Sequence, residues 1–167
     1  MTMKNRAMLI GAIRAGKTTL GQVLLGKKVK PRKTQSLIYY DWIVDTPGEY
    51  TENPFYYKSI MTTMLEVTHV LFIQDATKKA SIFPPGFAAG INKLIIGVVT
   101  KCDHENADVD RAVGHLKKAI TTGPIVVTSS YTAIGVQELR ELVACSSIQE
   151  MRDFTKASQP EAVIFHE

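Results

Sequence analysis

The sequence is poor in cysteine, in net charge and in long apolar runs. Cys102 and Cys145 are the only cysteines among 167 residues, and neither has companions at a metal-ligand spacing, so a disulfide framework is excluded and a reducing cytosol is expected. The net charge of +4 is too small to argue for a nucleic-acid partner. Because the sequence has no run of about 18 apolar residues and no signal-peptide core, we expect neither a membrane span nor secretion.

One stretch carries a specific chemical signal, because residues 11–18 match the phosphate-binding pattern G-x-x-x-x-G-K-[ST]. An apolar run precedes it and a helical pattern follows from residue 19, which is the strand–loop–helix context of a phosphate loop. Backbone N–H groups of such a loop point at phosphate oxygens, and the helix dipole favours their negative charge. Lys17 is expected to reach the β- and γ-phosphates, and Thr18 to place its hydroxyl on Mg²⁺. The predicted nucleotide contacts in this stretch are Gly11, Ile13, Arg14, Ala15, Gly16, Lys17, Thr18 and Thr19.

Apolar runs and helical patterns alternate along the chain. Strands are predicted over 7–10, 38–44, 70–74, 94–100 and 125–128, and helices over 18–25, 54–67, 108–121 and 135–147. Several strands are continuous apolar runs, as expected when helices cover both faces of a parallel sheet. The chain is therefore predicted to have an α/β, three-layer P-loop NTPase fold with a mostly parallel sheet of about five to six strands.

Two segments depart from this alternation. Residues 80–90 contain two prolines and two glycines where a crossover helix is expected, which predicts a short or broken helix. Ile82, Phe83 and Phe87 would then either plug the sheet surface themselves or form a docking patch for a partner. We place the nucleotide domain at 1–147 and a C-terminal extension at 148–167. A flexible end is favoured for this extension, with an added helix, an added strand or a docking peptide as alternatives.

Side chains suited to Mg²⁺ lie at and before the end of the second predicted strand. Asp45 opens the string D-T-P-G-E and stands 27 residues after Thr18, where a carboxylate holds the Mg²⁺ shell. Gly48 can turn its N–H onto the γ-phosphate. Thr34, 16 residues after Thr18, is the candidate that completes the shell, with a threonine that merely starts a strand as the alternative. The predicted metal ligands are thus Thr18, Thr34 and Asp45.

A base-reading motif is predicted at the end of the strand over 94–100. Asp103 can accept hydrogen bonds from the paired imino and amino donors of guanine, a pair that adenine lacks, and the stem of Lys101 can cover the base. Thr100 stands where the usual N-K-x-D pattern has asparagine, which removes an amide that ties the base to the phosphate loop. GTP and GDP are therefore favoured as ligands over ATP, without excluding ATP. Ser129 and Ser130, at the end of the last predicted strand, offer backbone N–H groups to the guanine carbonyl.

The phosphate loop and the D-T-P-G, T-K-x-D and S-S motifs occur in this order, each at a strand end, and together resemble the Ras-like or translation-factor GTPases over about residues 6–147. A closer resemblance is to the EutP/PduV family, through K-T-Q at Lys33-Thr34-Gln35 after Arg32, D-T-P-G-E-Y over 45–50 and P-P-G-F over 84–87. This resemblance implies a Ras-like fold, nucleotide binding, and association with the shells or the positioning of bacterial microcompartments for ethanolamine and propanediol utilisation. It also leaves open an acetate-kinase-like phosphotransferase role.

Residues around the predicted γ-phosphate position bear on the rate of hydrolysis. Glu49 stands where Ras-like enzymes place a water-orienting glutamine, and an ionised carboxylate cannot donate a hydrogen bond and would repel the phosphate. Ile13 would crowd an incoming arginine finger, while Arg14 either supplies positive charge or points to solvent. With Lys17, Gly48 and Glu49 as the predicted catalytic groups, we expect hydrolysis slower than about 10⁻² s⁻¹ without a partner.

Three functions are compatible with these residues. The first is a slow Mg²⁺-dependent GTPase or GTP-binding switch, the second is an ATP-dependent phosphotransferase, and the third is a structural or positioning adaptor with little turnover. The linker over 27–33 carries five basic residues, which indicate a solvated loop, or alternatively a lid over the phosphates or a patch for an acidic partner. The presence of Lys17, Thr18 and Asp45 together argues against a vestigial site.

Overall fold

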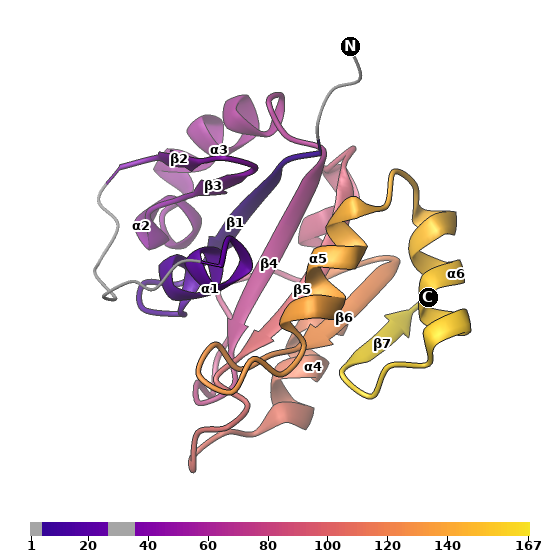
Figure 1. The fold of residues 1–167 in the computed structure, drawn as a ribbon. Helices are drawn as coiled ribbons and strands as arrows, with labels where there is room; N and C mark the ends of the chain where they lie inside the picture. The colour runs from indigo at the N-terminus through magenta and orange to yellow at the C-terminus, as the bar shows by residue number, and fades with distance from the viewer. Residues whose placement is uncertain (1–4, 27–35) are drawn as a thin grey trace.

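The computed structural model describes residues 5–26 and 36–167, which form one sheet with a layer of helices on each face (Figure 1). The strand order is β2-β3-β1-β4-β5-β6-β7. Five strands (β1, β3, β4, β5 and β6) run parallel, while β2 and β7 join antiparallel at the two ends. The strands are β1 (Ala7–Gly11), β2 (Ile38–Tyr40), β3 (Ile43–Asp45), β4 (His69–Asp75), β5 (Leu94–Thr100), β6 (Gly123–Val127) and β7 (Val163–His166). The predicted fold class is confirmed, since this mostly parallel α/β sheet is consistent with a P-loop NTPase-like fold.

Helices cover both faces of the sheet. Figure 1 shows α1, α5 and α6 on one face and α3 and α4 on the other. The helices are α1 (Lys17–Leu24), α2 (Gly48–Glu52), η1 (Pro54–Tyr56), α3 (Tyr57–Met64), η2 (Phe87–Gly90), α4 (Val109–Ala119), α5 (Val136–Ala144) and α6 (Ile148–Ser158), where η marks a 3-10 helix. Among these described helices, none is long and apolar enough to cross a membrane.

Each face of the sheet has its own hydrophobic core. Successive side chains of a strand point to opposite faces, so in β4 Val70 and Phe72 enter the core under α3 and α4, while Leu71 and Ile73 enter the core under α1, α5 and α6. All four are at most 1% exposed. Burial of side chains of this size stabilises the fold by about 1.5–3 kcal/mol each. Burial on both faces explains why β4 has a continuous apolar sequence rather than an alternating one.

The segment over 38–44 forms a hairpin, and the prediction of a single strand there is wrong. β2 pairs antiparallel with β3, and Tyr40 faces Ile43 across a two-residue turn. Asp41 has a left-handed backbone in that turn, with φ of 50°, which aspartate tolerates better than most residues. Aromatic residues flank this aspartate and no glycine marks the turn, so the hairpin is hidden in the sequence. Because β3 lies beside β1, the hairpin places Asp45 next to the phosphate loop.

Aromatic side chains take the place of a full crossover helix between β4 and β5. Within residues 76–93, all of which the structure describes, the single helical element is η2. Phe83 stacks on Phe72 with ring centroids 4.9 Å apart, and Phe87 meets Phe72 edge-on at 5.6 Å. Phe83 is 6% exposed. The prediction of a short or broken helix is confirmed, and these rings plug the sheet surface themselves, which is the first of the two alternatives.

The C-terminal extension is folded onto the rest of the domain. The sequence favours a flexible end, whereas the structure contains the alternative, an added helix (α6) and an added strand (β7). Ser147 caps α6, because its Oγ accepts a hydrogen bond from the Glu150 N–H at 3.1 Å. Met151 is fully buried in the core under this helix. β7 pairs with β6 and brings the sheet to seven strands rather than five to six.

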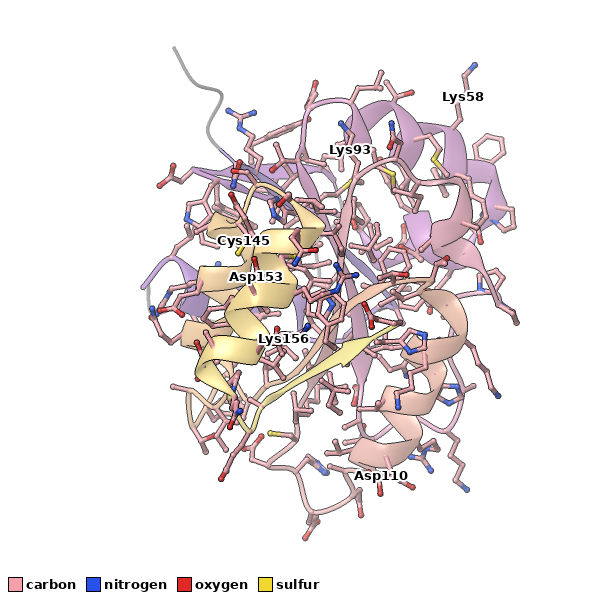
Figure 2. The ribbon with its side chains drawn as sticks, turned by 90° about the vertical axis from the view of Figure 1, so that its right-hand side faces the viewer. Lys58, Lys93, Asp110, Cys145, Asp153 and Lys156 are labelled. Carbon is pink, nitrogen blue, oxygen red and sulfur yellow. The ribbon has the colours of Figure 1, made fainter. Side chains whose placement is uncertain are left out.

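One side chain joins the two added elements to each other. Arg152 of α6 forms an ion pair with Glu167 at 2.7 Å, and its guanidinium lies over the ring of Phe165 at 5.1 Å from the centroid. Figure 2 shows α6 and β7 facing the viewer, with Asp153 and Lys156 labelled on α6. The extension is therefore held by the buried side chains of Met151 and Val163, by the pairing of β7 with β6, and by the ion pair and cation–π contact of Arg152.

Candidate functional site

The candidate site lies along the edge of the sheet where the parallel strands end. Because five strands are parallel, their carboxyl ends meet at this edge, which is where ligands bind in open α/β sheets. The loop over 11–16 follows β1, and Asp45 closes β3. Asp75 and Thr100 close β4 and β5. The phosphate loop, Asp45 and Thr100, all predicted site elements, thus come together from β1, β3 and β5, with Asp75 of β4 at the same edge.

The loop between β1 and α1 curls around the ammonium group of Lys17. The Nζ atom donates hydrogen bonds to the carbonyl oxygens of Gly11 at 3.0 Å and Ala12 at 2.8 Å. Arg14 and Gly16 both have left-handed backbones, with φ of 64° and 96°. Glycine takes this conformation without steric cost, whereas a residue with a side chain gives up about 1–2 kcal/mol. The turn leaves Lys17 only 6% exposed, so the loop encloses a buried cation.

The electrostatic setting of Lys17 favours an anion. Burial lowers the pKa of Lys17 from 10.5 to about 8, and the negative charges of Asp45 and Glu52 offset part of this effect. The ammonium is still charged at neutral pH, and its desolvation is not fully compensated by these carboxylates. A phosphate group inside the loop would supply negative charge at the shortest range and raise this pKa.

Thr18 and Asp45 meet at the first turn of α1. The Thr18 hydroxyl donates to Asp45 Oδ2 at 2.5 Å, and Asp45 is 1% exposed. The neighbouring Thr46 hydroxyl donates to Leu9 O at 2.7 Å, which fixes the end of β3 to β1. Within residues 5–26 and 36–167, no group of three or more His, Cys, Asp or Glu could hold a metal. A hydroxyl and a carboxylate fit Mg²⁺ that is bound together with phosphate oxygens and water.

The D-T-P-G turn packs directly on the phosphate loop. A Cβ atom added to Gly48 would lie 2.3 Å from Ile13 N and 2.5 Å from Ile13 Cα, so the backbone contact requires glycine. Gly48 also begins α2, and the half-buried Glu49 lies in its first turn. The structure thus brings Gly48 against the loop and carries Glu49 on the adjoining turn. Thr34, the third predicted metal ligand, and the basic linker over 27–33 lie outside the described residues.

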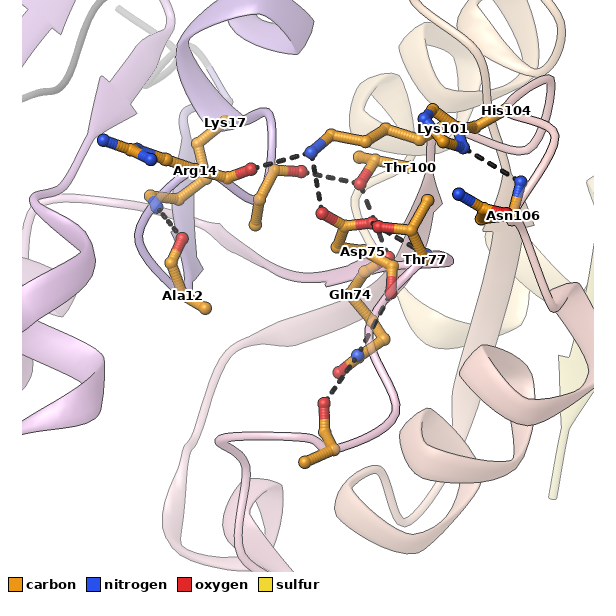
Figure 3. Close-up of polar contacts among 12 residues, drawn as sticks. Ala12, Arg14, Lys17, Gln74, Asp75, Thr77, Thr100, Lys101, His104 and Asn106 are labelled. Atoms are coloured by element: carbon orange, nitrogen blue, oxygen red, sulfur yellow. Dashed lines mark hydrogen bonds and ion pairs between the residues drawn. The ribbon is translucent and has the colours of Figure 1, made fainter.

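The first two side chains of the T-K-C-D motif are tied to the phosphate loop (Figure 3). Thr100 Oγ1 donates to Ala15 O at 2.6 Å, and Lys101 Nζ donates to Arg14 O at 2.9 Å. The reach of the Lys101 ammonium back to the loop is confirmed. The threonine hydroxyl keeps a link between motif and loop, although it carries one proton where an asparagine amide carries two.

Asp75 is a residue of this network that sequence reasoning missed. Its carboxylate is 2% exposed, pairs with Lys101 Nζ at 2.7 Å, and accepts hydrogen bonds from the Thr77 N–H at 2.8 Å and hydroxyl at 2.7 Å. Burial raises the pKa of Asp75, but the hydrogen bonds from Lys101 and Thr77 outweigh burial and leave the pKa below its ordinary value. The available signal is an aspartate that closes a buried apolar strand, as Asp45 also does.

The remaining base-reading candidates lie on two loops that are hydrogen-bonded to each other. The Cys102 N–H donates a hydrogen bond to Thr128 O at 3.1 Å. Asp103, the next residue after Cys102, is exposed. The Ser129 N–H donates to Ile134 O at 3.0 Å. This bond commits Ser129 to the protein backbone, so the predicted contact with a base carbonyl rests on Ser130, which is half-buried.

Three sets of groups define what this edge of the sheet can do chemically. Lys17 can hold an anion, the Thr18–Asp45 pair can share a hard cation with that anion, and the exposed Asp103 can accept hydrogen bonds from a planar ligand. Thr19, the last predicted contact, lies in the first turn of α1. Asp45, Lys17 and Asp103 follow β3, β1 and β5, so these groups lie along one edge of the sheet.

Known proteins resemble this chain over most of its length. A family model, PduV-EutP, described as ethanolamine utilisation – propanediol utilisation, matches residues 3–145. The chain is 38% identical over 98 residues to the propanediol utilization protein PduV of Citrobacter freundii, an alignment that covers 59% of this chain and 65% of that protein, less than two thirds of its length.

Two other relatives match over a longer span. The chain is 33% identical to the probable acetate kinase EutP of Escherichia coli strain K12 and 34% identical to the probable acetate kinase EutP of Salmonella typhimurium, each over 147 residues. Both alignments cover 87% of this chain and 92% of the relative. The family model ends at residue 145, so α6 and β7 lie beyond it.

Proposed function

The chain belongs to the EutP/PduV family of ethanolamine and propanediol utilisation, and from that membership we propose that it binds a nucleoside di- or triphosphate with Mg²⁺ and hydrolyses the triphosphate slowly. The observation that carries the proposal is the buried Lys17 ammonium inside the loop over 11–18, 3.0 and 2.8 Å from two loop carbonyls. A hydroxyl–carboxylate pair stands beside it. A packed domain has no structural need for a cation, a hydroxyl and a carboxylate enclosed at the start of one helix.

Each group of the site has a role toward the phosphates. Lys17 exchanges its loop carbonyls for β- and γ-phosphate oxygens, and backbone N–H groups of the loop hold the same oxygens. Thr18 and Asp45 hold Mg²⁺, which neutralises phosphate charge when it is bound. The Gly48 N–H binds the γ-phosphate. Glu49 orients water poorly, because an ionised carboxylate accepts hydrogen bonds but donates none, and hydrolysis is therefore slow.

Guanine is the favoured base. Asp103 accepts from the two adjacent donors of guanine, a pair that adenine does not present, and the Lys101 stem lies across the base. The Ser130 N–H meets the guanine carbonyl. GTP and GDP are therefore the favoured ligands, and ATP is the weaker one.

Binding and its dependence on Lys17 test the core of this proposal. Calorimetric titration with GDP, GTP, ADP and ATP, with and without Mg²⁺, should show Mg²⁺-dependent binding with guanine favoured. Lys17→Ala should weaken binding by at least about tenfold, because a charge-assisted contact is lost. Lys156→Ala, which removes an exposed lysine on α6, is the matched control. No binding by the wild type, or equal binding by the Lys17 variant, would refute the proposal.

Single-turnover kinetics test the rate. Hydrolysis of Mg²⁺-GTP should be slower than about 10⁻² s⁻¹ in the absence of a partner. A rate of tens per second would contradict the assigned role of Glu49.

A second candidate function is an ATP-dependent phosphotransferase, favoured by the name probable acetate kinase that two relatives carry. The test is to incubate the protein with Mg²⁺-ATP and acetate and to trap acetyl phosphate with hydroxylamine, using Lys17→Ala as the control. Acetyl phosphate formed by the wild type alone, together with a preference for ATP, would favour this function over GTP hydrolysis.

Family membership also supports a cytoplasmic role beside a bacterial microcompartment, with a shell or positioning protein as partner. A fluorescent fusion should colocalise with labelled compartments, and diffuse fluorescence would contradict this placement. If Lys17→Ala colocalises as the wild type does while it no longer binds nucleotide, a positioning adaptor is favoured over a nucleotide-controlled switch.

A further inference from the structure

Thr100 links two parts of the candidate site. It closes β5, is 3% exposed, and donates its hydroxyl proton to Ala15 O, which lies 2.6 Å from Thr100 Oγ1. The alternative acceptor, Gln74 O, lies farther away, at 3.5 Å. Its side chain also packs beside Gly16, because its Cβ, Oγ1 and Cγ2 lie 3.8–3.9 Å from a Cβ built on that glycine. Thr100 is thus hydrogen-bonded to the phosphate loop at Ala15 and lies beside Gly16.

A threonine hydroxyl has one proton to donate, and Ala15 O receives it. Purine bases present acceptors at N7, and guanine a second acceptor at O6. Thr100 therefore has no donor left for these base atoms. An asparagine amide would carry two donors and could serve the loop and the base together.

The orientation of one peptide group shows what the Thr100 bond accomplishes. The carbonyl of Ala15 and the N–H of Gly16 belong to the same planar peptide and point in opposite directions. When Thr100 holds the Ala15 carbonyl on the β5 side, the Gly16 N–H is turned away from β5. Lys101 also fixes the loop backbone, because its ammonium donates to Arg14 O and is itself held by Asp75.

We propose that Thr100 is a positioning residue for the phosphate loop and does not read the base, so that the site binds mainly through phosphate and accepts both guanine and adenine nucleotides. This inference rests on the proposed nucleotide site and concerns which end of the nucleotide supplies the affinity. Base selection then depends on the exposed Asp103 and on Ser130, where water competes for the same contacts. The preference for GDP over ADP should accordingly be about tenfold or less.

The experiment compares ligands with and without a base. Dissociation constants for Mg²⁺-GDP, Mg²⁺-ADP and Mg²⁺-pyrophosphate are measured by calorimetry for the wild type, Thr100→Val and Thr100→Ser. Thr100→Val keeps the branched shape and removes the hydroxyl, so it should weaken all three ligands by a similar factor, about three- to tenfold. Thr100→Ser keeps the hydroxyl and should bind all three within about twofold of the wild type. If the valine variant does not fold, Thr100→Ala is measured in its place.

Asp103→Asn provides the contrasting variant. This variant should lower the ratio of GDP to ADP affinity and leave pyrophosphate binding unchanged, because Asp103 lies at the base end of the proposed site and pyrophosphate has no base. A wild type that prefers GDP by more than about a hundredfold, or a Thr100→Val variant that alters the GDP to ADP ratio and spares pyrophosphate, would overturn the inference while leaving nucleotide binding intact. A wild type that binds none of the three ligands would overturn the proposed function as well.

Discussion

Gly48→Ala is the sharpest single perturbation that the structure offers. A methyl group at this position would lie 2.3 Å from Ile13 N, 2.5 Å from Ile13 Cα and 2.7 Å from Ile13 Cγ1. Two of these atoms belong to the backbone of the phosphate loop, so a rotamer change cannot relieve the contact. Either the D-T-P-G turn or the loop must move, at a cost of about 1–3 kcal/mol in the free energy of unfolding.

The assay is thermal unfolding, with Gly114→Ala as the control. Gly114 lies inside α4, and a Cβ built there meets no atom within 4 Å. Alanine should stabilise that helix by about 0.5–1 kcal/mol. For a chain of this length the melting temperature should fall by about 2–12 °C in Gly48→Ala and rise by about 1–4 °C in Gly114→Ala.

A double variant decides whether the backbone contact is responsible. Ile13→Ala removes Cγ1 but leaves Ile13 N and Cα in place, so Gly48→Ala with Ile13→Ala should be no more stable than Gly48→Ala alone. Restored stability in the double variant would refute the reasoning. So would a Gly48→Ala variant that melts at the wild-type temperature.

Three further variants test other parts of the domain. In the wild type, the free energy of unfolding should rise between pH about 8 and 10.5 by up to about 1.4 kcal/mol per pH unit, because in that window the unfolded chain binds more protons at Lys17 than the folded chain does. Lys17→Met should remove this rise. Urea unfolding at both ends of the window measures it. Asp75→Asn should cost about 1–3 kcal/mol at neutral pH by removing the charge paired with Lys101. Since the pKa of Asp75 is lowered in the fold, this wild-type advantage is present above pH 3.8 and is lost as the pH falls through the folded pKa, so an advantage that persists in acid would contradict the assignment. Met151→Ala should cost about 2–5 kcal/mol in urea unfolding, while Lys156→Ala should stay within about 0.5 kcal/mol; equal stabilities would show that α6 contributes no packing.

Local sequence patterns predict the parts of the molecule whose geometry is local. The loop over 11–18 is recognisable because its glycines and Lys17 lie within one turn of backbone, and the strand over 94–100 coincides with β5 because lysines flank its apolar run on both sides. The clustering of Asp45 and Thr100 at one edge also follows, since parallel strands end together.

Features that depend on pairing between distant segments escape the sequence. The turn at Asp41 becomes visible only when β2 is found antiparallel to β3. Asp75 looks like a strand end until Lys101 is seen 2.7 Å away. The extension after residue 147 has a local helix-start signal in Ser147 and Glu150, but Met151 is the one buried residue of α6 and β7 has four residues, so its docking depends on contacts with the core and with β6.

The strands at the two ends of the sheet have a consequence for how the protein behaves at high concentration. A long, unpaired outer strand invites strands from other chains, and short outer strands reduce that hazard. β2 has three residues and β7 has four, and β7 takes up the outer hydrogen-bonding groups of the longer, apolar β6. Arg152, through Glu167 and Phe165, fastens that protective strand to α6. Resistance to self-association should therefore depend on the docking of this C-terminal unit, which lies well away from the loop that encloses Lys17.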